Sequence, residues 1–445
     1  MSEAAAPTRQ QQRRVLVQLG ASGVVATICY AVITRATSLS QLRPLAATLI
    51  ATLPFIVAAR VALSREAAAL SRRALLAVVV LGVVAMRLAV PLGKPTASDD
   101  AYRYLWDGRV QAAGHNPYAY PPQHPRLVEL RDARFYPNVF RPDLRTVYPG
   151  LAEMWFVVAY AISPSGFIGL KLVLLLHDLA ALLLLWRLLS QRGLAPARVV
   201  LYVWSPLVVV QLYAGCHLDG LIVPWLLACV MWAESRPLLA GAALGASAMV
   251  RPITALCGPA LALRRPIKEG ALAALGFVVA AALCVLPYAR AGAKMVESLL
   301  VYSKHWQFNG SLFRLLDALL NQKRWFRNAL YAGIAAGSLG IGALRRPPRS
   351  ARMALALALY FAFAPTVYPW YLIAPLALAV LHGSGLLVVA LPALASLADL
   401  VWLDGVVGGQ WSVPTWALLL EYGGLYGLLG YELWRGRRPA APQRE

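Results

Sequence analysis

The sequence predicts an all-α polytopic membrane protein, and its composition and apolar runs carry this prediction. Of 445 residues, 59% are hydrophobic and 14% are charged. Several apolar runs reach about 18 residues or more, the length at which an α-helix crosses the core of a bilayer. Because lipid-exposed backbone must form its hydrogen bonds within its own segment, these runs should cross as helices. We expect a single transmembrane domain over residues 1–445, with a bundle of about 12 transmembrane helices.

The net charge of +22 is expected to come from arginine-rich loops on the cytoplasmic side of the membrane. A nucleic acid partner would require an exposed basic domain, and the sequence has none. Positive charge precedes the first expected span (14–34) and follows the second (45–63), which places the N-terminus in the cytoplasm. A third span (74–92) leads out of the cytoplasm, and arginines after the last apolar run place the C-terminus inside. The expected location is therefore the inner (plasma) membrane, as a multi-pass protein.

The longest polar interval, residues 93–149, is the expected extracytoplasmic loop and concentrates acidic side chains. It contains the stretch SDDAYRYLWDGRVQAAGHNPYAYPP, which begins at Ser98. Ser98 is a suitable N-cap and a Gly-His-Asn-Pro sequence ends a helix, so a short interfacial helix is expected here. On that helix Asp100, Arg103 and Asp107 share one face, since they are spaced at i, i+3 and i+7. Asp107 is expected to be a structural partner of Arg103 or of the arginine that follows it.

Two apolar pieces are too short for a simple crossing. Residues 151–162 cover only about 18 Å at 1.5 Å per residue, so they should lie at the interface or insert halfway. Residues 238–263 divide at Arg251 into two short halves, which predicts a re-entrant hairpin with Arg251 near its tip. The alternative is one long kinked helix in which Arg251 forms a structural ion pair. With these assignments, His217 and Asp219 return to the face of the acidic loop.

The adjacent carboxylates Asp99 and Asp100 are the residues of the loop that most clearly suggest a catalytic function. Such a pair can provide a general base that takes a proton from an attacking hydroxyl, or ligands for a divalent cation. The structural alternative is a helix N-terminus with solvated charge. The sequence His217-Leu218-Asp219 can bind a sugar hydroxyl, bind a metal or cap the next helix. One His and one Asp are no complete ligand set, so no metal site is expected.

A second outer loop, residues 289–328, and a later membrane exit carry aromatic and polar clusters. Their candidate binding residues are Trp306, Asn309, Tyr368 and Trp370. Aromatic residues at membrane exits are typical of the interfacial belt, and the functional alternative is stacking on sugar rings or guiding an isoprenoid chain. Lys304, His305 and Arg251 can neutralise a phosphate, a role that suits arginine through bidentate hydrogen bonds.

In this order, the pieces resemble the GT-C superfamily of membrane glycosyltransferases, and more narrowly its bacterial mannosyltransferase-type members near glycosyltransferase family 87. Besides the first stretch, the matching pieces are TVYPGLAEMWF at 146–156, GCHLDG at 215–220, HWQFNGS at 305–311 and PTVYPWYL at 365–372. The sequence departs from the family pattern in the three spans before the acidic loop. It also departs at Gly150, where relatives often carry a second proline, and at Tyr368, where they often carry histidine.

The resemblance implies a GT-C-like fold and transfer of a sugar, with mannose favoured, from a polyprenyl-phosphate donor to a lipid or glycan hydroxyl at the extracytoplasmic face. The catalytic acidic pair of the superfamily maps onto Asp99 and Asp100, one of which would be the general base of a single inverting displacement. The leaving phosphate then needs charge stabilisation only, for which the candidates are Arg103, Arg251, Lys304 and His305. Acceptor or sugar binding is expected from His217, Asp219, Trp306, Asn309, Tyr368 and Trp370. A divalent cation is the one cofactor that this scheme leaves open.

Two other function classes fit parts of the sequence. A transporter or flippase of lipid-linked sugars would have inverted repeats and ionisable residues on broken midplane helices. Arg251 fits that class loosely, but no repeat is visible. An envelope-glycan ligase or polymerase would differ in its acceptor and in the placement of its key His and Arg residues.

Overall fold

The chain is helical throughout the part that the computed structural model describes, so the all-α prediction is confirmed. The described residues are 8–36, 39, 41–96, 98–320, 324–382, 385–403 and 411–437. Within them, β-structure is limited to isolated bridges from Phe308 and Asn309 to Thr366. The predicted placement of the two chain ends concerns residues 1–7 and 438–445, which lie outside the described residues.

Most helices follow one another with short connections, whereas a long loop separates Asp100–Ala112 from Gly150–Ile162. The first are α1 (Arg9–Ile33), α2 (Arg43–Ala62), α3 (Arg65–Ala68) and α4 (Arg72–Ala89). The middle of the chain forms α5 (Asp100–Ala112), α6 (Gly150–Ile162), α7 (Ile168–Gln191), α8 (Val200–Val203), α9 (Pro206–Val209), α10 (Ile222–Trp232), α11 (Pro237–Ala248), α12 (Gly258–Ala262) and α13 (Ile267–Val285). The remainder forms α14 (Lys294–His305), α15 (Leu312–Leu319), α16 (Arg324–Ala343), α17 (Arg349–Phe363), α18 (Ile373–Ala379), α19 (Leu386–Ala395) and α21 (Thr415–Arg437). Short 3₁₀ or π turns are η2 (Pro125–Leu130), η3 (Tyr136–Asn138), η4 (Pro196–Val199), η5 (Val210–Ala214), η6 (Leu218–Leu221), η7 (Pro252–Cys257), η8 (Leu286–Ala291), η9 (Pro369–Leu372) and η10 (Ser396–Trp402).

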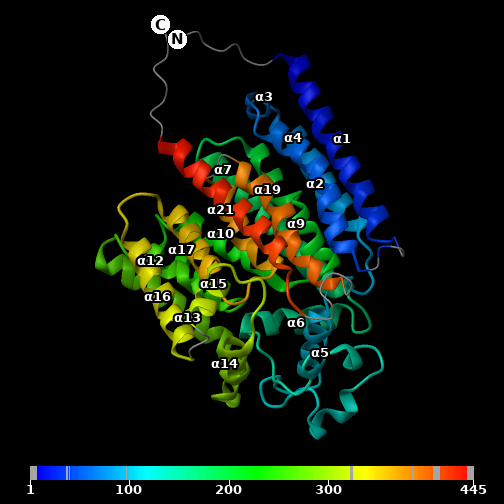
Figure 1. Cartoon of the computed structure of the whole chain (residues 1–445), viewed down its shortest axis with the longest axis vertical. Helices are drawn as coiled ribbons and strands as arrows, with labels where there is room; N and C mark the ends of the chain where they lie inside the picture. The colour runs from blue at the N-terminus through cyan, green and yellow to red at the C-terminus, as the bar shows by residue number, and fades with distance from the viewer. Residues whose placement is uncertain are drawn as a thin grey trace.

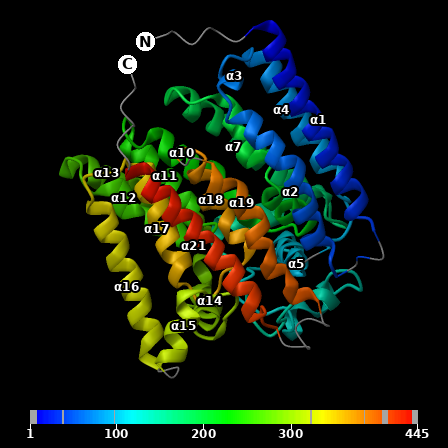
Figure 2. The ribbon, with the colours of Figure 1, turned by 45° about the horizontal axis from the view of Figure 1, so that its top comes forward.

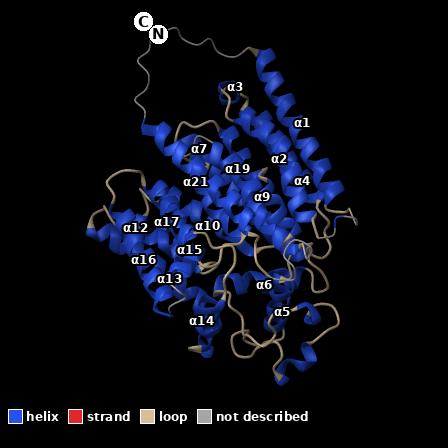
Figure 3. Cartoon of the chain, in the orientation of Figure 1, coloured by secondary structure: helices blue, strands red, loops and turns tan. Residues whose placement is uncertain are grey.

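The helices pack side by side, with α1 at one edge and α16 at the opposite edge (Figure 1 and Figure 2). Buried apolar side chains from α1, α2, α4, α7 and the segments α8 to α10 belong to one continuous core. The long loop between α5 and α6 lies with these two helices at one end of the molecule (Figure 3). The polar interval 93–149 therefore covers one end of the helical bundle.

Within the described part of the chain, four helices are long and apolar enough to cross a membrane, namely α1, α2, α7 and the segment Ile267–Ala291 that contains α13. A pair bent by 47°, Pro196–Val203 and Pro206–Ala214, would make a fifth span. Other apolar runs form shorter helices, among them Gly150–Ile162, Leu218–Trp232 and Leu386–Trp402. The predicted number of about 12 spans therefore stays a prediction, and residues 151–162 have the short length that was expected.

The predicted break in residues 238–263 is confirmed. Between α11 and η7 the backbone of Arg251 is extended, with φ −141° and ψ 116°. The break frees the carbonyl of Met249 from its own helix, and this carbonyl accepts the N–H of Leu151 at 3.0 Å. The N-terminus of α6, which otherwise lacks acceptors for its first N–H groups, is thus joined to the end of α11.

Small residues let α13 approach two other helices closely. A Cβ atom at Gly241 of α11 would lie 1.8 Å from the carbonyl oxygen of Ala273. A Cβ atom at Gly150, the first residue of α6, would lie 2.1 Å from the carbonyl oxygen of Cys284. Close backbone contact of this kind is the usual way in which small residues join helices in membranes. The backbone of α13 therefore touches α11 near one end and α6 near the other.

A buried ion pair links α4 to α7. Arg87 donates to the carboxylate of Asp178 from Nε at 3.0 Å and from Nη2 at 2.6 Å. The hydroxyl of Tyr213 donates to the same oxygen at 3.1 Å, and the Arg87 guanidinium lies 5.2 Å from the Tyr213 ring centroid. Charged groups within an apolar bundle are retained when they are paired in this way. Asp178, to which the sequence assigned no role, therefore has a structural one.

Replacing Arg87 by methionine should destabilise the protein by about 3–5 kcal/mol, because Asp178 would be left as an unpaired buried charge. The double variant Arg87→Met/Asp178→Leu should recover most of this loss, because no charge remains to be desolvated. Thermal unfolding of the purified protein in detergent measures both. A double variant as unstable as the single one would contradict the assignment.

Candidate functional site

A cavity of about 780 Å³ opens beside the N-terminus of α5. It collects residues from the acidic loop, the break at Arg251, α14 and the turn before α18. Of the residues predicted from the sequence, it is lined by Asp99, Asp100, Arg103, Arg251, His305, Trp306, Tyr368 and Trp370. The structure thus brings together carboxylates, cations and aromatic rings that are up to 270 residues apart along the chain.

The acidic pair occupies the start of α5, as the sequence predicted. The helix begins one residue later than the predicted N-cap at Ser98, because Asp99 is the N-cap and its side chain makes no capping hydrogen bond. The hydroxyl of Ser98 accepts the N–H of Asp100, the first helical residue, at 3.1 Å. The hydroxyl of Tyr104, one turn later, donates to Asp100 at 3.4 Å. Asp99 precedes the helix on the cavity wall. The protein around it displaces water and the charge of Asp100 repels its own, so that the pKa of Asp99 is raised to about 6.

A column of stacked rings ends at the acidic pair. Phe308 stacks on Tyr368 and Tyr368 on Trp370, each with ring centroids 4.4 Å apart. Trp370 stacks on His217 at 3.5 Å with an angle of 10° between the rings. His217 is fully buried, and its Nδ1 lies 3.6 Å from Oδ2 of Asp100. This distance is too long for a hydrogen bond, and neither ring nitrogen of His217 has another partner among the described residues.

Asp219 holds Arg251 behind the same wall of the cavity. Nε and Nη2 of Arg251 donate to the two carboxylate oxygens of Asp219, each at 2.9 Å. The guanidinium also lies over the ring of Tyr371, 4.3 Å from its centroid. The predicted return of His217 and Asp219 to the acidic pair is thus confirmed. Neither of them lines the cavity, however, because His217 is covered by Trp370 and Asp219 by its arginine.

Arg103 lines the cavity and keeps one donor free. Its Nε donates to Asp107 at 2.8 Å, and its Nη1 donates to the carbonyl of Leu144 at 3.0 Å. Its buried Nη2 has no partner among the described residues. The prediction that Asp107 is a structural partner of Arg103 is confirmed, and the remaining N–H groups of Arg103 are available to a ligand.

Two predicted residues lie apart from the cavity. Lys304 is exposed on α14 and does not line it. Asn309 is buried in another place, where its Nδ2 donates to Glu421 at 3.2 Å and its carbonyl accepts the hydroxyl of Tyr422. With φ of +51°, Asn309 adopts the left-handed conformation that asparagine tolerates. Its observed contacts are those of a turn-forming structural residue.

Several cavity residues were not predicted. Arg141 and Arg145 come from the acidic loop and pair with Asp143 and Glu297 respectively, at 2.6 Å and 2.8 Å. Their position in the same polar interval was the signal that could have found them. The aromatic side chains that complete the wall are Phe140, Tyr302, Tyr371, Trp402 and Trp411. Trp402 follows an apolar run and Trp411 follows Gly-Gly-Gln, and no local pattern separates either from ordinary interfacial aromatics.

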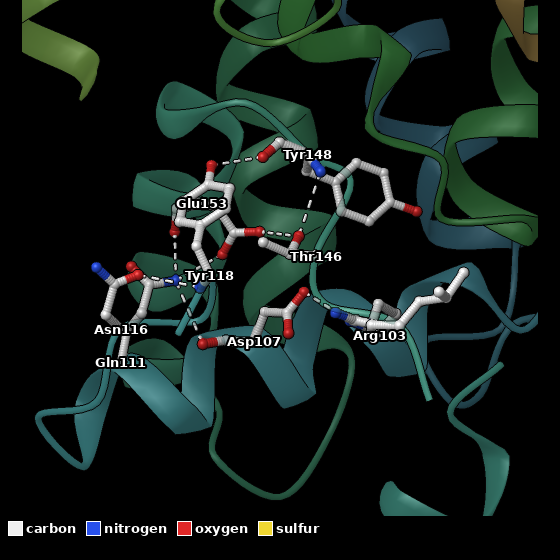
Figure 4. Close-up of polar contacts among 9 residues, drawn as sticks. Arg103, Asp107, Gln111, Asn116, Tyr118, Thr146, Tyr148 and Glu153 are labelled. Atoms are coloured by element: carbon white, nitrogen blue, oxygen red, sulfur yellow. Dashed lines mark hydrogen bonds and ion pairs between the residues drawn. The ribbon is translucent and has the colours of Figure 1, made fainter. Parts of the chain in front are cut away.

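A buried polar network beneath the cavity fixes the loop that enters α6 (Figure 4). The hydroxyl of Thr146 donates to Oε1 of Glu153 at 2.5 Å, and the amide of Gln111 donates to Oε2 at 2.9 Å. The hydroxyl of Tyr118 donates to the carbonyl of Tyr148 at 2.5 Å. Burial, and then the charge of nearby Asp107, raise the pKa of Glu153 well above its usual range. The network therefore favours a neutral carboxyl group at Glu153.

Glu153→Gln should change the free energy of unfolding by less than about 1 kcal/mol, because the amide oxygen can accept from Gln111 while the amide nitrogen donates to the hydroxyl of Thr146, which rotates to accept. Glu153→Leu should cost about 2–4 kcal/mol, because the partners on Thr146 and Gln111 lose their acceptor. Thermal unfolding in detergent compares the two variants. Equal destabilisation by both would show that Glu153 is ionised in the folded protein.

No group of three or more His, Cys, Asp or Glu side chains that could hold a metal ion occurs within the described residues. Among the described residues that line the cavity, Asp99 and Asp100 are the two carboxylates. The divalent cation considered from the sequence stays a prediction.

A family model described as "Alpha-(1->6)-mannopyranosyltransferase, N-terminal domain" matches residues 14–265, more than half of the 445 residues. The matched range contains the acidic pair and Arg251, whereas His305, Trp306, Tyr368 and Trp370 lie beyond it. This match confirms the resemblance to mannosyltransferases inferred from the sequence motifs. No curated protein matches the chain, and no solved structure does.

Proposed function

Since the chain belongs to the alpha-(1->6)-mannopyranosyltransferase family, we propose that it transfers mannose from a polyprenyl-phosphate donor to a hydroxyl group of a lipid or glycan acceptor. Family membership supports glycosyltransferase activity. The observation that carries the finer proposal is the acidic pair at the wall of a cavity that also contains cations and stacked aromatic rings. A sugar phosphate carries the groups that complement these side chains. Its hydroxyl groups can bind the carboxylates, its apolar ring face can stack on the aromatic rings, and its negative charge can bind the cations.

In the proposed reaction, Asp100 or Asp99 takes the proton of the acceptor hydroxyl as its oxygen attacks the anomeric carbon. The new C–O bond forms as the bond from that carbon to the phosphate oxygen breaks, and the electron pair leaves with the polyprenyl phosphate. A single displacement inverts the anomeric carbon, so an α-linked product requires a β-linked donor. The Asp100 carboxylate accepts the hydroxyl of Tyr104 at 3.4 Å and has the ring of His217 beside it.

Charge that develops on the leaving phosphate needs donors already in place. Nη2 of Arg103 has no protein partner, and His305 and Arg251 also line the cavity. Arg251 already donates two hydrogen bonds to Asp219. It would therefore stabilise the leaving phosphate mainly through its positive charge and less through direct hydrogen bonds. The rings of Trp306 and Tyr368 are the surfaces for the sugar or the isoprenoid chain. His217 and Asp219, being covered, would position Asp100 and Arg251 and make no direct contact with the acceptor.

The proposed setting is the inner membrane, with about 12 crossings in a GT-C-like bundle and the cavity on the extracytoplasmic side. The distribution of arginine supports this orientation. Arg264 and Arg265 stand at the start of the span Ile267–Ala291, and the acidic loop contacts its other end through Asn116 and Tyr288. The positive-inside rule then puts the acidic pair outside.

The variant Asp99→Asn/Asp100→Asn should lower transfer by at least about a hundredfold, because the acceptor hydroxyl loses its base. The assay supplies polyprenyl-phosphate mannose and envelope lipids to proteoliposomes. Glu129→Gln, which removes an exposed carboxylate from the same loop, is the matched control and should be unaffected. Wild-type turnover by the double variant would refute the assignment, and unmodified donor crossing the bilayer would favour a transporter.

The transfer rate should rise as the pH increases through about 6, the pKa of Asp99. Below that pH Asp99 is protonated, so it cannot take the proton of the acceptor hydroxyl. The pair Asp99 and Asp100 then also carries less negative charge. In Asp99→Asn any remaining activity should lose this inflection. The kcat/KM values of both proteins between about pH 5 and about pH 8 provide the measurement. A wild-type profile without a rise near pH 6 would exclude a titrating Asp99 from the reaction.

A further inference from the structure

A second cavity, of about 510 Å³, lies among arginines far from the acidic pair. It is formed by the end of α12, the connection between α16 and α17, and the turn after α10. Five arginines and a single acidic residue line it: Glu234, Arg264, Arg345, Arg346, Arg349 and Arg352. A pocket with this composition carries a strong positive potential.

The positive charge of this arginine pocket is largely uncompensated. Arg349 forms an ion pair with Glu234, and no other carboxylate lines the pocket. Arg352 is buried, and its Nη1 donates to the backbone carbonyls of Gly342 and Leu344. The buried Nε atoms of Arg349 and Arg352 have no partner among the described residues. Guanidinium groups gathered in this way repel one another unless an anion lies between them.

The arginine pocket lies next to the start of an exposed apolar helix. Arg264 is followed by the candidate span Ile267–Ala291, of whose apolar window only 17% is buried. At the start of that span Ile267 is 91% exposed. Leu344, which lines the pocket, is 43% exposed. An exposed apolar helix that begins just after a pocket arginine is a surface that an amphipathic lipid can cover with its chains while its headgroup enters the pocket.

The pocket and the acidic pair lie at opposite ends of the same span. The 25 residues of Ile267–Ala291 extend over roughly 37 Å at 1.5 Å per residue. Arg264 precedes the first turn, whereas Tyr288 near the last turn donates to Gln111 beside the acidic loop. The ligand of the arginine pocket therefore cannot be the molecule that meets Asp99 and Asp100.

We propose that the arginine pocket binds the phosphate-bearing headgroup of an anionic membrane lipid whose chains lie along α13. Arginine is the side chain that matches phosphate oxygens with paired N–H groups. The free donors of Arg349 and Arg352, with the unpaired charges of Arg345 and Arg346, supply this recognition. The exposed apolar start of α13 favours a lipid over a soluble phosphate.

The test uses the full chain in detergent and native mass spectrometry with added phosphatidylglycerol. The wild type should retain phosphatidylglycerol in preference to phosphatidylcholine. In Arg345→Gln/Arg346→Gln its affinity should fall at least about tenfold, because charged hydrogen bonds to the phosphate are lost. Arg345 and Arg346 are exposed, so the fold should survive, which gel filtration checks. Arg72→Gln/Arg73→Gln removes two exposed arginines at the start of α4 and should leave binding unchanged.

Unchanged phosphatidylglycerol binding in Arg345→Gln/Arg346→Gln would overturn the proposal. An equal loss in both variants would do the same, because it would show attraction to total charge only. Inorganic phosphate is the second probe, added in competition with the lipid. If it binds as tightly as the lipid and displaces it, the pocket is a site for soluble phosphate and the lipid assignment is wrong. None of these outcomes depends on sugar transfer.

Discussion

The ion pair between Arg251 and Asp219 is the interaction on which the site depends. It joins the break after α11 to the turn before α10, and it does so where the surrounding side chains are apolar. Such a pair contributes little net stability, but removal of either partner leaves a buried charge, so the two must remain together. His217 lies only two residues before Asp219, so fixing Asp219 also restrains His217. The ring of His217 stacks on Trp370 and faces Asp100. The acidic pair, which comes from a surface loop, thereby meets a rigid wall.

Several features of this arrangement could be predicted because their causes are local. The start of α5 lies one residue beyond the predicted N-cap at Ser98, whose hydroxyl accepts the first helical N–H, and its end follows from a Gly-His-Asn-Pro sequence. The break at Arg251 follows from a charge and a proline between two halves too short to cross. The return of His217 to the face of the acidic loop was inferred because residues 151–162 are too short to cross a bilayer, which puts the arginines after α7 in the cytoplasm. The hydrogen bond of Ser98, the extended backbone of Arg251 and the contact of His217 with Asp100 agree with these inferences.

Features that depend on contacts between residues far apart in the chain could not be predicted from the sequence. Asn309 belongs to a motif that suggested sugar binding, yet its partner is Glu421, which lies 112 residues further along the chain. The cavity walls formed by Trp402 and Trp411 likewise depend on how α19 and α21 are packed. Counting spans from apolar runs was limited by prolines and bends, since runs such as 200–214 contain more than one short helix. Apolar content alone does not tell a crossing helix from a half-helix within the bundle.

The close approach at Gly150 has a consequence for the evolution of these proteins. A Cβ atom at 2.1 Å from a backbone oxygen cannot be accommodated by side-chain rearrangement, so any other residue requires the two helices to separate. A relative with proline at this position must therefore hold its equivalents of α6 and α13 further apart. Residue 150 and the small residues that line α13 are then expected to change together during divergence. The identity of this one residue becomes an indicator of helix spacing that can be read without a structure.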